Sequence, residues 1–178
     1  MTKTQTGTLY LIVGPSGAGK DTLITAARDR LGQTHVFPKR TITRPILSPG
    51  EVHIAATVDS FTTQVRAGYF ALTWRAHGLH YGIPNSILDD IKRGKHVVAN
   101  VSREMIEQAK RTFNPVQVIL VTAPIQILST RLNSRGRESP SDITGRLTRQ
   151  TEITANTTIV NDGSIETALS QFILALQS

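Results

Sequence analysis

The fold is decided by one stretch near the N-terminus, Thr8-Leu9-Tyr10-Leu11-Ile12-Val13-Gly14-Pro15-Ser16-Gly17-Ala18-Gly19-Lys20. Its first half is a short apolar run that ends in glycine, which is typical of a buried strand. After Lys20, the apolar positions Leu23, Ala27 and Leu31 recur at helical spacing, and Gly32 provides a natural end. The stretch therefore predicts a strand, a glycine-rich loop and a helix from Asp21 to Leu31.

The loop has the spacing Gly14-x-x-x-x-Gly19-Lys20. Glycines let backbone amides curl toward a polyphosphate, and the start of the helix adds partial positive charge. Lys20 is placed to neutralise the charge that grows on the β- and γ-phosphates during transfer. A chance glycine-rich turn is the competing interpretation, and the flanking strand and helix argue against it. We expect ATP to bind at Gly14, Pro15, Ser16, Gly17, Ala18, Gly19, Lys20, Asp21 and Thr22.

One position of the loop departs from the usual pattern. Serine or threonine normally follows the lysine and places a hydroxyl on Mg²⁺, whereas this chain has Asp21 and then Thr22. A carboxylate beside a triphosphate repels it unless a cation lies between them. We therefore expect Asp21 to contact Mg²⁺ directly or through water. The alternative is that Asp21 only favours the helix N-terminus electrostatically.

Composition narrows the class of protein. The 178 residues, 39% of them hydrophobic, suit one compact domain over 1–178 with an embedded subdomain. No apolar run is long enough for a membrane span, and the polar N-terminus lacks the apolar core of a signal peptide. Without cysteine there is no disulfide or thiolate metal site, and the five histidines show no ligand spacing. The expected location is cytoplasmic, with no membrane partner.

The net charge of +7 comes from 14 Arg and 6 Lys. Arginine grips phosphate with a planar fork, so this balance suits an anionic small molecule. A basic surface also suits nucleic acid. Aromatic residues make up only 5% of the chain, and no nucleic-acid motif is present, so no nucleic-acid partner is expected.

The remaining chain alternates between strand and helix patterns, which predicts an α/β fold with a parallel sheet covered on both faces. Strands are expected at 36–42, 52–58, 69–76, 80–81, 95–101, 116–121 and 157–160. Helices are expected from Asp59 or Ser60 to near 68, from Pro84 to 93, and at 104–113, 124–132, 142–154 and 165–176. The strand-rich region at about 36–83 is interpreted as an inserted acceptor subdomain.

Several motifs, in order, resemble the guanylate kinase family over about residues 8–176. They are the loop itself, Thr41-Ile42-Thr43-Arg44-Pro45 with Pro49-Gly50-Glu51-Val52, the hairpin from Gly68 to Pro84 with Tyr81-Gly82-Ile83-Pro84, the arginine-rich Arg131 to Arg137, and Val160-Asn161-Asp162. The resemblance implies a P-loop NTPase fold of three α/β/α layers, with an acceptor subdomain and an arginine-rich lid at about 131–146. It places Asn161 near the adenine.

The departures from this family concern the guanine. Guanylate kinases read guanine with a carboxylate in the hairpin, where this chain has Leu72. A second acidic pair of the family falls on Asn100 and Ser102. Guanine N–H donors left without acceptors cost about 1–3 kcal/mol each, so the chain resembles a relative that no longer reads guanine.

That combination is similar to the ribose 1,5-bisphosphate phosphokinases, a family of the phosphonate-degradation pathway with Lys-Asp in the loop and Arg-x-x-x-Arg-Pro at Arg40 and Arg44. The resemblance implies transfer of the γ-phosphoryl group of ATP to ribose 1,5-bisphosphate, which gives 5-phosphoribosyl diphosphate. Because the attacking oxygen is already anionic, no general base is needed.

The expected roles follow from this resemblance. Acceptor binding is assigned to Arg40, Arg44, Tyr81, Asn100 and Ser102. Closure over ATP and charge stabilisation are assigned to Arg131, Arg135, Arg137 and Arg146, with Lys20 and the last three counted as catalytic. Each arginine has a bland alternative as a solvated surface charge, and Tyr81 as a half-buried packing residue.

Other functions stay open at this point. They are a kinase for a nucleoside monophosphate or another sugar phosphate, a guanylate kinase-like binding module without activity, and a nucleic-acid binder. The intact Gly14, Gly19 and Lys20 argue against the inactive module. The sequence does not define the oligomeric state, and a homodimer remains an alternative to a monomer.

Overall fold

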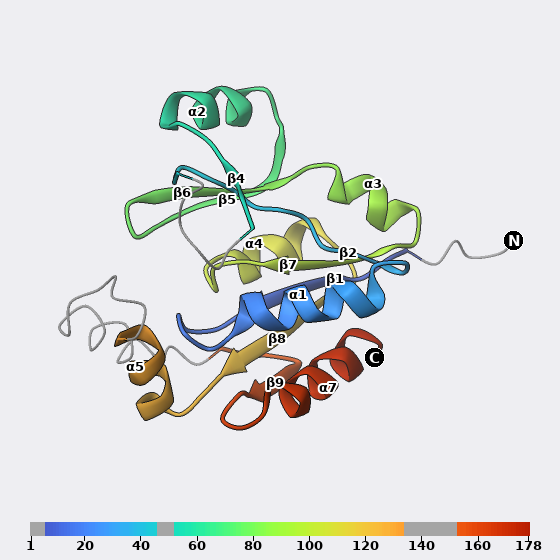
Figure 1. Cartoon of the computed structure of the whole chain (residues 1–178). Coiled ribbons are helices and arrows are strands. Elements are labelled where there is room, and N and C mark those ends of the chain that lie inside the picture. Colours follow the sequence, from blue (N-terminus) through green and yellow to red (C-terminus); the bar gives the residue numbers. More distant parts are fainter. Residues whose placement is uncertain (1–5, 46–51, 134–152) are drawn as a thin grey trace, which may run out of the picture.

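The computed structural model describes residues 6–45, 52–133 and 153–178. Two sheets organise them (Figure 1). The larger sheet has the strand order β2-β7-β1-β8-β9 and every pairing in it is parallel. The smaller has the order β4-β3-β6-β5. The predicted parallel α/β core and the separate strand-rich region are both confirmed.

The core sheet and its helices have these bounds. Its strands are β1 Leu9–Val13, β2 His35–Val36, β7 His96–Asn100, β8 Val116–Thr122 and β9 Thr157–Val160. The helices are α1 Lys20–Leu31, α3 Ile87–Lys92, α4 Met105–Thr112, α5 Ile125–Asn133 and α7 Ile165–Leu176.

The small sheet is formed by β3 Thr41–Ile42, β4 Ile54–Ala55, β5 Phe70–Ala76 and β6 Leu79–Pro84, with helix α2 Val58–Arg66 beside it. In Figure 1 this sheet and α2 lie at the top, above the core sheet.

Strand β1 shows why the core has two layers. All five of its residues are buried, and alternate side chains point to opposite faces. Tyr10 and Ile12 pack with α1 and α7, whereas Leu9, Leu11 and Val13 pack with α3 and α4. A strand buried on both faces needs an unbroken apolar run, which is the pattern found in the sequence.

The region predicted as one strand at 36–42 is divided. Residue 36 pairs with β7 in the core sheet, and Thr41 pairs with Gly82 in the small sheet. The residues from Phe37 to Arg40 therefore connect the two sheets, and the prediction of one continuous strand is wrong. Pro38 lacks the N–H that a central strand would need. This connection carries Arg40 across the space between the sheets.

Two helix starts also differ from the sequence prediction. Thr57, and not Asp59 or Ser60, caps α2: its Oγ1 accepts a hydrogen bond from the Ser60 N–H at 3.1 Å. Pro84 does not open a helix. It ends β6 opposite Phe70, where the ladder register shifts, so its missing N–H interrupts no regular pairing, and α3 begins at Ile87.

The predicted lid falls largely outside the described residues, as does the helix predicted at 142–154. Residues 153 and 154 are described and are not helical, so the predicted end of that helix is wrong. Helix α5 extends to Asn133. Among the described helices, none has the length and apolarity to cross a bilayer.

Candidate active site

The phosphate loop joins β1 to α1 at the carboxyl edge of the core sheet. Gly14 has φ 143° and lies so close to β8 that an added Cβ would come within 1.9 Å of the Val121 carbonyl oxygen. Gly19 has φ 91° and an added Cβ there would meet the Asn161 amide at 2.4 Å. Only glycine fits both positions, so the conformation of the loop is fixed by packing as well as by sequence.

The side chain of Asn161 contacts this loop and is hydrogen-bonded to it. Its side chain is 3% exposed, and its Nδ2 donates to the Ala18 carbonyl at 2.8 Å. This bond ties the end of β9 to the loop across 143 residues of sequence. The structure thus gives Asn161 a role in holding the loop, while its predicted proximity to adenine stays a prediction.

Lys20 lies where the loop meets the helix. Its Nζ donates to the carbonyl oxygens of Gly14 at 2.7 Å and Pro15 at 2.9 Å. The ammonium group therefore sits over the loop it belongs to. Arg131 reaches the same loop from α5, with Nη1 3.3 Å from the Gly17 carbonyl oxygen. Both predicted ATP-side cations are thus brought to the loop.

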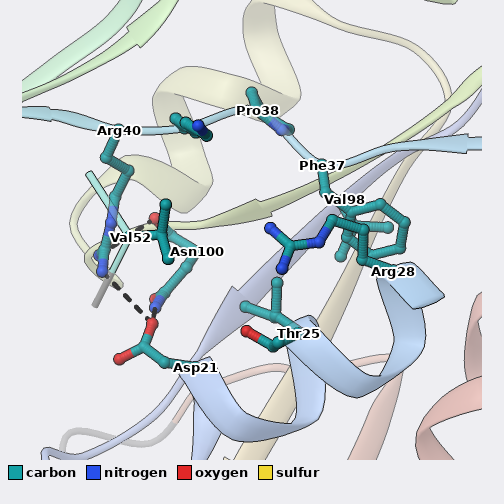
Figure 2. Close-up of a pocket in the computed structure, with 11 residues that line it drawn as sticks. Asp21, Thr25, Arg28, Phe37, Pro38, Arg40, Val52, Val98 and Asn100 are labelled. Carbon is teal, nitrogen blue, oxygen red and sulfur yellow. Dashed lines mark hydrogen bonds and ion pairs between the residues drawn. The ribbon is translucent and has the colours of Figure 1, made fainter. Parts of the chain in front are cut away.

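The predicted acceptor side lies next to Asp21 and is shown in Figure 2, where Arg40, Asp21 and Asn100 point toward one another. Arg40 Nη2 lies 3.5 Å from Asp21 Oδ1, and Arg40 Nη1 donates to the Asn100 backbone carbonyl at 3.4 Å. Asn100 Nδ2 donates to the same Asp21 oxygen at 2.8 Å. These three residues line a cavity of about 90 Å³.

Tyr81 extends this arrangement into the small sheet. The Arg40 guanidinium carbon lies 5.9 Å from the centre of the Tyr81 ring, and Tyr81 stacks on Trp74 at 5.2 Å with the rings 6° from parallel. A cation over an aromatic face is stabilised by the ring quadrupole. A continuous series of contacts thus links the hairpin, Arg40 and the first turn of α1.

Leu72 lies in the buried core, 1% exposed, in the same apolar cluster as Trp74. This is the hairpin position at which guanylate kinases were expected to carry a carboxylate. In this chain the position is occupied by an apolar side chain that packs among other apolar residues. The position therefore offers no acceptor for guanine N–H groups.

The other predicted acceptor residues are placed less directly. Arg44 is half-buried at the end of β3, and its backbone carbonyl accepts from His53 Nε2 at 3.2 Å. Ser102 is half-buried just after β7, and its carbonyl accepts from the Met105 N–H at 2.9 Å. Thr22 is exposed on α1. The predicted residues Arg135, Arg137 and Arg146 lie outside the described residues.

A contact that sequence reasoning missed is the one between Asp21 and Asn100. The two residues are 79 positions apart and were assigned to different ligands. The parallel pairing of β1 with β7, with Ile12 opposite Asn100, is what brings them together. The order of the strands in the sheet, which the sequence pattern does not fix, was the missing information.

The titrating groups with shifted pKa values lie at the opposite edge of the sheet. His96, at the start of β7, has its pKa lowered by burial and by the neighbouring His35, whose ring centre is 5.0 Å away. Burial raises the pKa of Tyr10, against a smaller opposing effect of Thr8. These groups concern stability and are separate from the phosphate loop.

The geometry defines a phosphate-loop α/β protein with a cationic site opposite the loop. In agreement, the family model described as guanylate kinase matches residues 6–178. A guanylate kinase structure from Anaplasma phagocytophilum superposes with a TM-score of 0.68 over 98% of this chain and 86% of that one. The two sequences are 15% identical, so this likeness concerns the fold alone.

Sequence relatives narrow the family further. A protein described as ribose 1,5-bisphosphate phosphokinase PhnN from Acidiphilium cryptum is 46% identical, over 95% of this chain and 92% of its own length. The one from Methylobacterium radiotolerans is 40% identical over 97% and 98%. This chain belongs to the guanylate kinase family and, within it, to the PhnN ribose 1,5-bisphosphate phosphokinases.

A second kind of relative is longer. A bifunctional ribose 1,5-bisphosphokinase-thymidine phosphorylase from Cupriavidus pinatubonensis is 42% identical over 98% of this chain, which spans only 30% of that protein.

Proposed function

We propose that this chain transfers the γ-phosphoryl group of ATP to ribose 1,5-bisphosphate, with 5-phosphoribosyl 1-diphosphate and ADP as products. The observation that carries the proposal is the pairing of an intact phosphate loop with an acceptor side that has Arg40, and Leu72 at the hairpin position where guanylate kinases carry a carboxylate. The similarity to PhnN enzymes along almost their whole length supports the same acceptor.

The bond changes are those of a phosphate-to-phosphate transfer. An oxygen of the acceptor's 1-phosphate attacks the γ-phosphorus, and the bond from that phosphorus to the β–γ bridging oxygen breaks. The electron pair leaves with ADP. The attacking oxygen is already anionic, so no side chain has to remove a proton, and positioning and charge neutralisation carry the catalysis.

Different residues bind the ATP phosphates and the acceptor phosphate. The loop amides hold the ATP phosphates, and Lys20 exchanges its loop carbonyls for the β- and γ-phosphate oxygens. Arg40 holds acceptor phosphate with its fork while Tyr81 supports the guanidinium from the other side. Arg131 adds positive charge beside Gly17, and the predicted lid residues Arg135, Arg137 and Arg146 complete the closure over ATP.

Mg²⁺ fits the residues present at the loop. Asp21 is the first residue after Lys20, and its side chain is 42% exposed, so a carboxylate oxygen is accessible beside the phosphates. Within the described residues, no group of three or more His, Asp or Glu forms an all-protein metal site. One carboxylate suits Mg²⁺, because proteins usually hold this ion with one or two carboxylates and the substrate phosphates. When bound, Mg²⁺ would neutralise negative charge on the ATP phosphates.

The test is a coupled ADP-release assay with ATP, Mg²⁺ and a panel of acceptors: ribose 1,5-bisphosphate, ribose 5-phosphate and GMP. The proposal expects turnover with the bisphosphate at least about 100-fold above GMP, which corresponds to the loss of two charge-assisted hydrogen bonds to guanine. Turnover of GMP with none of ribose 1,5-bisphosphate would reject it in favour of a nucleoside monophosphate kinase.

A further inference from the structure

The contact between Asp21 and Asn100 joins the two segments that flank the phosphate site. Asp21 stands in the first turn of α1, and Asn100 is the last residue of β7. Because a carboxylate oxygen accepts only, the amide must present Nδ2 to Asp21 Oδ1, at 2.8 Å. Asn100 is only 9% exposed, whereas the Asp21 side chain is 42% exposed, so the bond is shielded from solvent on the Asn100 side.

The usual distribution of charge in phosphate-loop enzymes is the reverse of this one. A hydroxyl follows the loop lysine, and an aspartate at the end of a neighbouring strand provides the carboxylate, and both serve Mg²⁺. In this chain the carboxylate follows the lysine, as Asp21. The neighbouring strand, β7, ends in the uncharged Asn100.

We propose that the carboxylate serving Mg²⁺ has moved from strand β7 to helix α1, and that Asn100 is a positioning residue that orients it. The two positions have exchanged charge across one hydrogen bond, so this pair of positions keeps a single carboxylate. This inference rests on the binding of Mg·ATP in the proposed function and adds to it the residue that orients the metal-binding carboxylate.

The contacts of Asp21 support an orienting role. Asn100 and Arg40 both contact Oδ1. The carboxylate is therefore held by one oxygen, which leaves the other for a cation. Rotation of the carboxylate would break two contacts at once.

The contacts of Asn100 point the same way. Its Oδ1 is buried and has no hydrogen-bond partner in the described part of the chain. The bond to Asp21 is thus the side-chain hydrogen bond that offsets the burial of this amide. A strand-end residue with no role toward Asp21 would be better accommodated as a small apolar residue.

The exchange predicts that a change at either position alone is unfavourable. Aspartate at position 100 would place two carboxylates within hydrogen-bond distance, where like charges at short range repel strongly. Serine at position 21 would leave this pair of positions without a carboxylate. Serine at 21 together with aspartate at 100 restores one carboxylate and one neutral partner, in the usual positions.

The test compares the wild type with Asp21→Ser, Asn100→Asp and the double variant. The first readout is Mn²⁺ binding in the presence of the non-hydrolysable ATP analogue AMPPNP, followed by the electron paramagnetic resonance signal of free Mn²⁺. We expect Asp21→Ser to weaken Mn²⁺ binding at least about 10-fold, the loss of one charged ligand interaction, and the double variant to recover most of that loss.

The second readout is urea unfolding without metal or nucleotide. Asn100→Asp should lower the unfolding midpoint, and the double variant should restore it. Asn85→Ala, which removes an exposed amide that donates to the Gly68 carbonyl at 2.6 Å, is the control: it should leave Mn²⁺ binding unchanged and lower the unfolding midpoint less than Asn100→Asp does. If the effects of Asp21→Ser and Asn100→Asp simply add in the double variant, for both Mn²⁺ binding and the unfolding midpoint, the proposed exchange is wrong.

A further variant separates positioning from substrate contact. Asn100→Ser should weaken Mn²⁺ binding while the KM for the sugar bisphosphate stays within about twofold. A raised acceptor KM with unchanged Mn²⁺ binding would overturn the positioning role and make Asn100 an acceptor residue. If wild type binds no Mn·AMPPNP, the kinase proposal itself fails, and the inference fails with it.

Discussion

The phosphate loop and the acceptor side of the site are constructed in opposite ways. The loop is contiguous, from Gly14 to Asp21, and its shape follows from glycine geometry and close packing against Val121. The predicted acceptor side is assembled from Arg40 and Tyr81, which lie in different segments, and the Asn100 backbone carbonyl accepts from Arg40 at 3.4 Å. In the proposed function, phosphate binding is therefore a local property of the chain, whereas acceptor choice depends on its tertiary structure.

The largest effect is expected inside the loop. Lys20→Ala should lower kcat/KM for ATP by about 10³-fold, because no other described side chain provides an ammonium group at the transferring phosphates. Steady-state kinetics with an ADP-release assay measure this. Lys92→Ala, with a side chain 75% exposed on α3, is the matched control and should keep full activity. Equal activity of Lys20→Ala and wild type would contradict a local origin of phosphate binding.

On the acceptor side the loss should be smaller and confined to one substrate. Arg40→Ala removes a charge-assisted fork, and we expect KM for ribose 1,5-bisphosphate to rise by about 10- to 100-fold with little change in KM for ATP. Arg66→Ala, at an exposed position on α2, serves as the control. A rise in KM for ATP alone would move Arg40 to the nucleotide side and remove the contrast between the two regions.

The support beneath the loop should affect stability and ATP binding together. Asn161→Ala leaves the Ala18 carbonyl without its 2.8 Å donor, which should lower the free energy of unfolding by about 1–3 kcal/mol and raise KM for ATP. Urea unfolding and kinetics measure the two effects. Asn85→Ala loses a similar amide-to-carbonyl bond at an exposed site and should lose less stability. An unchanged KM for ATP would show that the loop does not depend on β9.

The smallest effect concerns pH and should leave both regions untouched. His96 Nδ1 accepts from the Thr8 N–H at 3.1 Å, so the folded state favours the neutral ring, in line with the lowered pKa of His96. The unfolded chain binds a proton more readily, so stability is complete above the ordinary pKa of 6.5 and falls as pH drops below it.

Urea midpoints at pH 7.5 and 5.5 measure this effect. His96→Gln should reduce the difference between the two midpoints. His77→Asn is the control, because His77 is exposed in the hairpin turn with φ 53°, a conformation that asparagine tolerates. An undiminished difference in His96→Gln would assign the pH dependence to other groups.

The same contrast explains what could be predicted from sequence. Strand β9 and helix α7 were predicted with the observed bounds, and the loop with its flanking strand and helix, because local periodicity and caps determine them. Ser164, for example, caps α7 by accepting from the Thr167 N–H at 3.2 Å.

The failures lie where tertiary pairing decides. The predicted strand at 36–42 is divided because its first residue pairs in the core sheet and its last two residues pair in the small sheet. Pro84 was predicted to start a helix because its pairing with Phe70, where the register shifts, is not visible in the sequence. The Asp21–Asn100 contact was missed for the same reason. Each of these positions lies on the acceptor side of the molecule or on the boundary with it.

The central claim is that this fold joins an ATP phosphate to a sugar phosphate. Phosphorus NMR of the purified protein with ATP, Mg²⁺ and ribose 1,5-bisphosphate tests it most directly. The account predicts a new pair of coupled diphosphate signals from 5-phosphoribosyl 1-diphosphate, growing with those of ADP. ADP with free inorganic phosphate and an unchanged sugar bisphosphate spectrum, or no reaction at all, would contradict it.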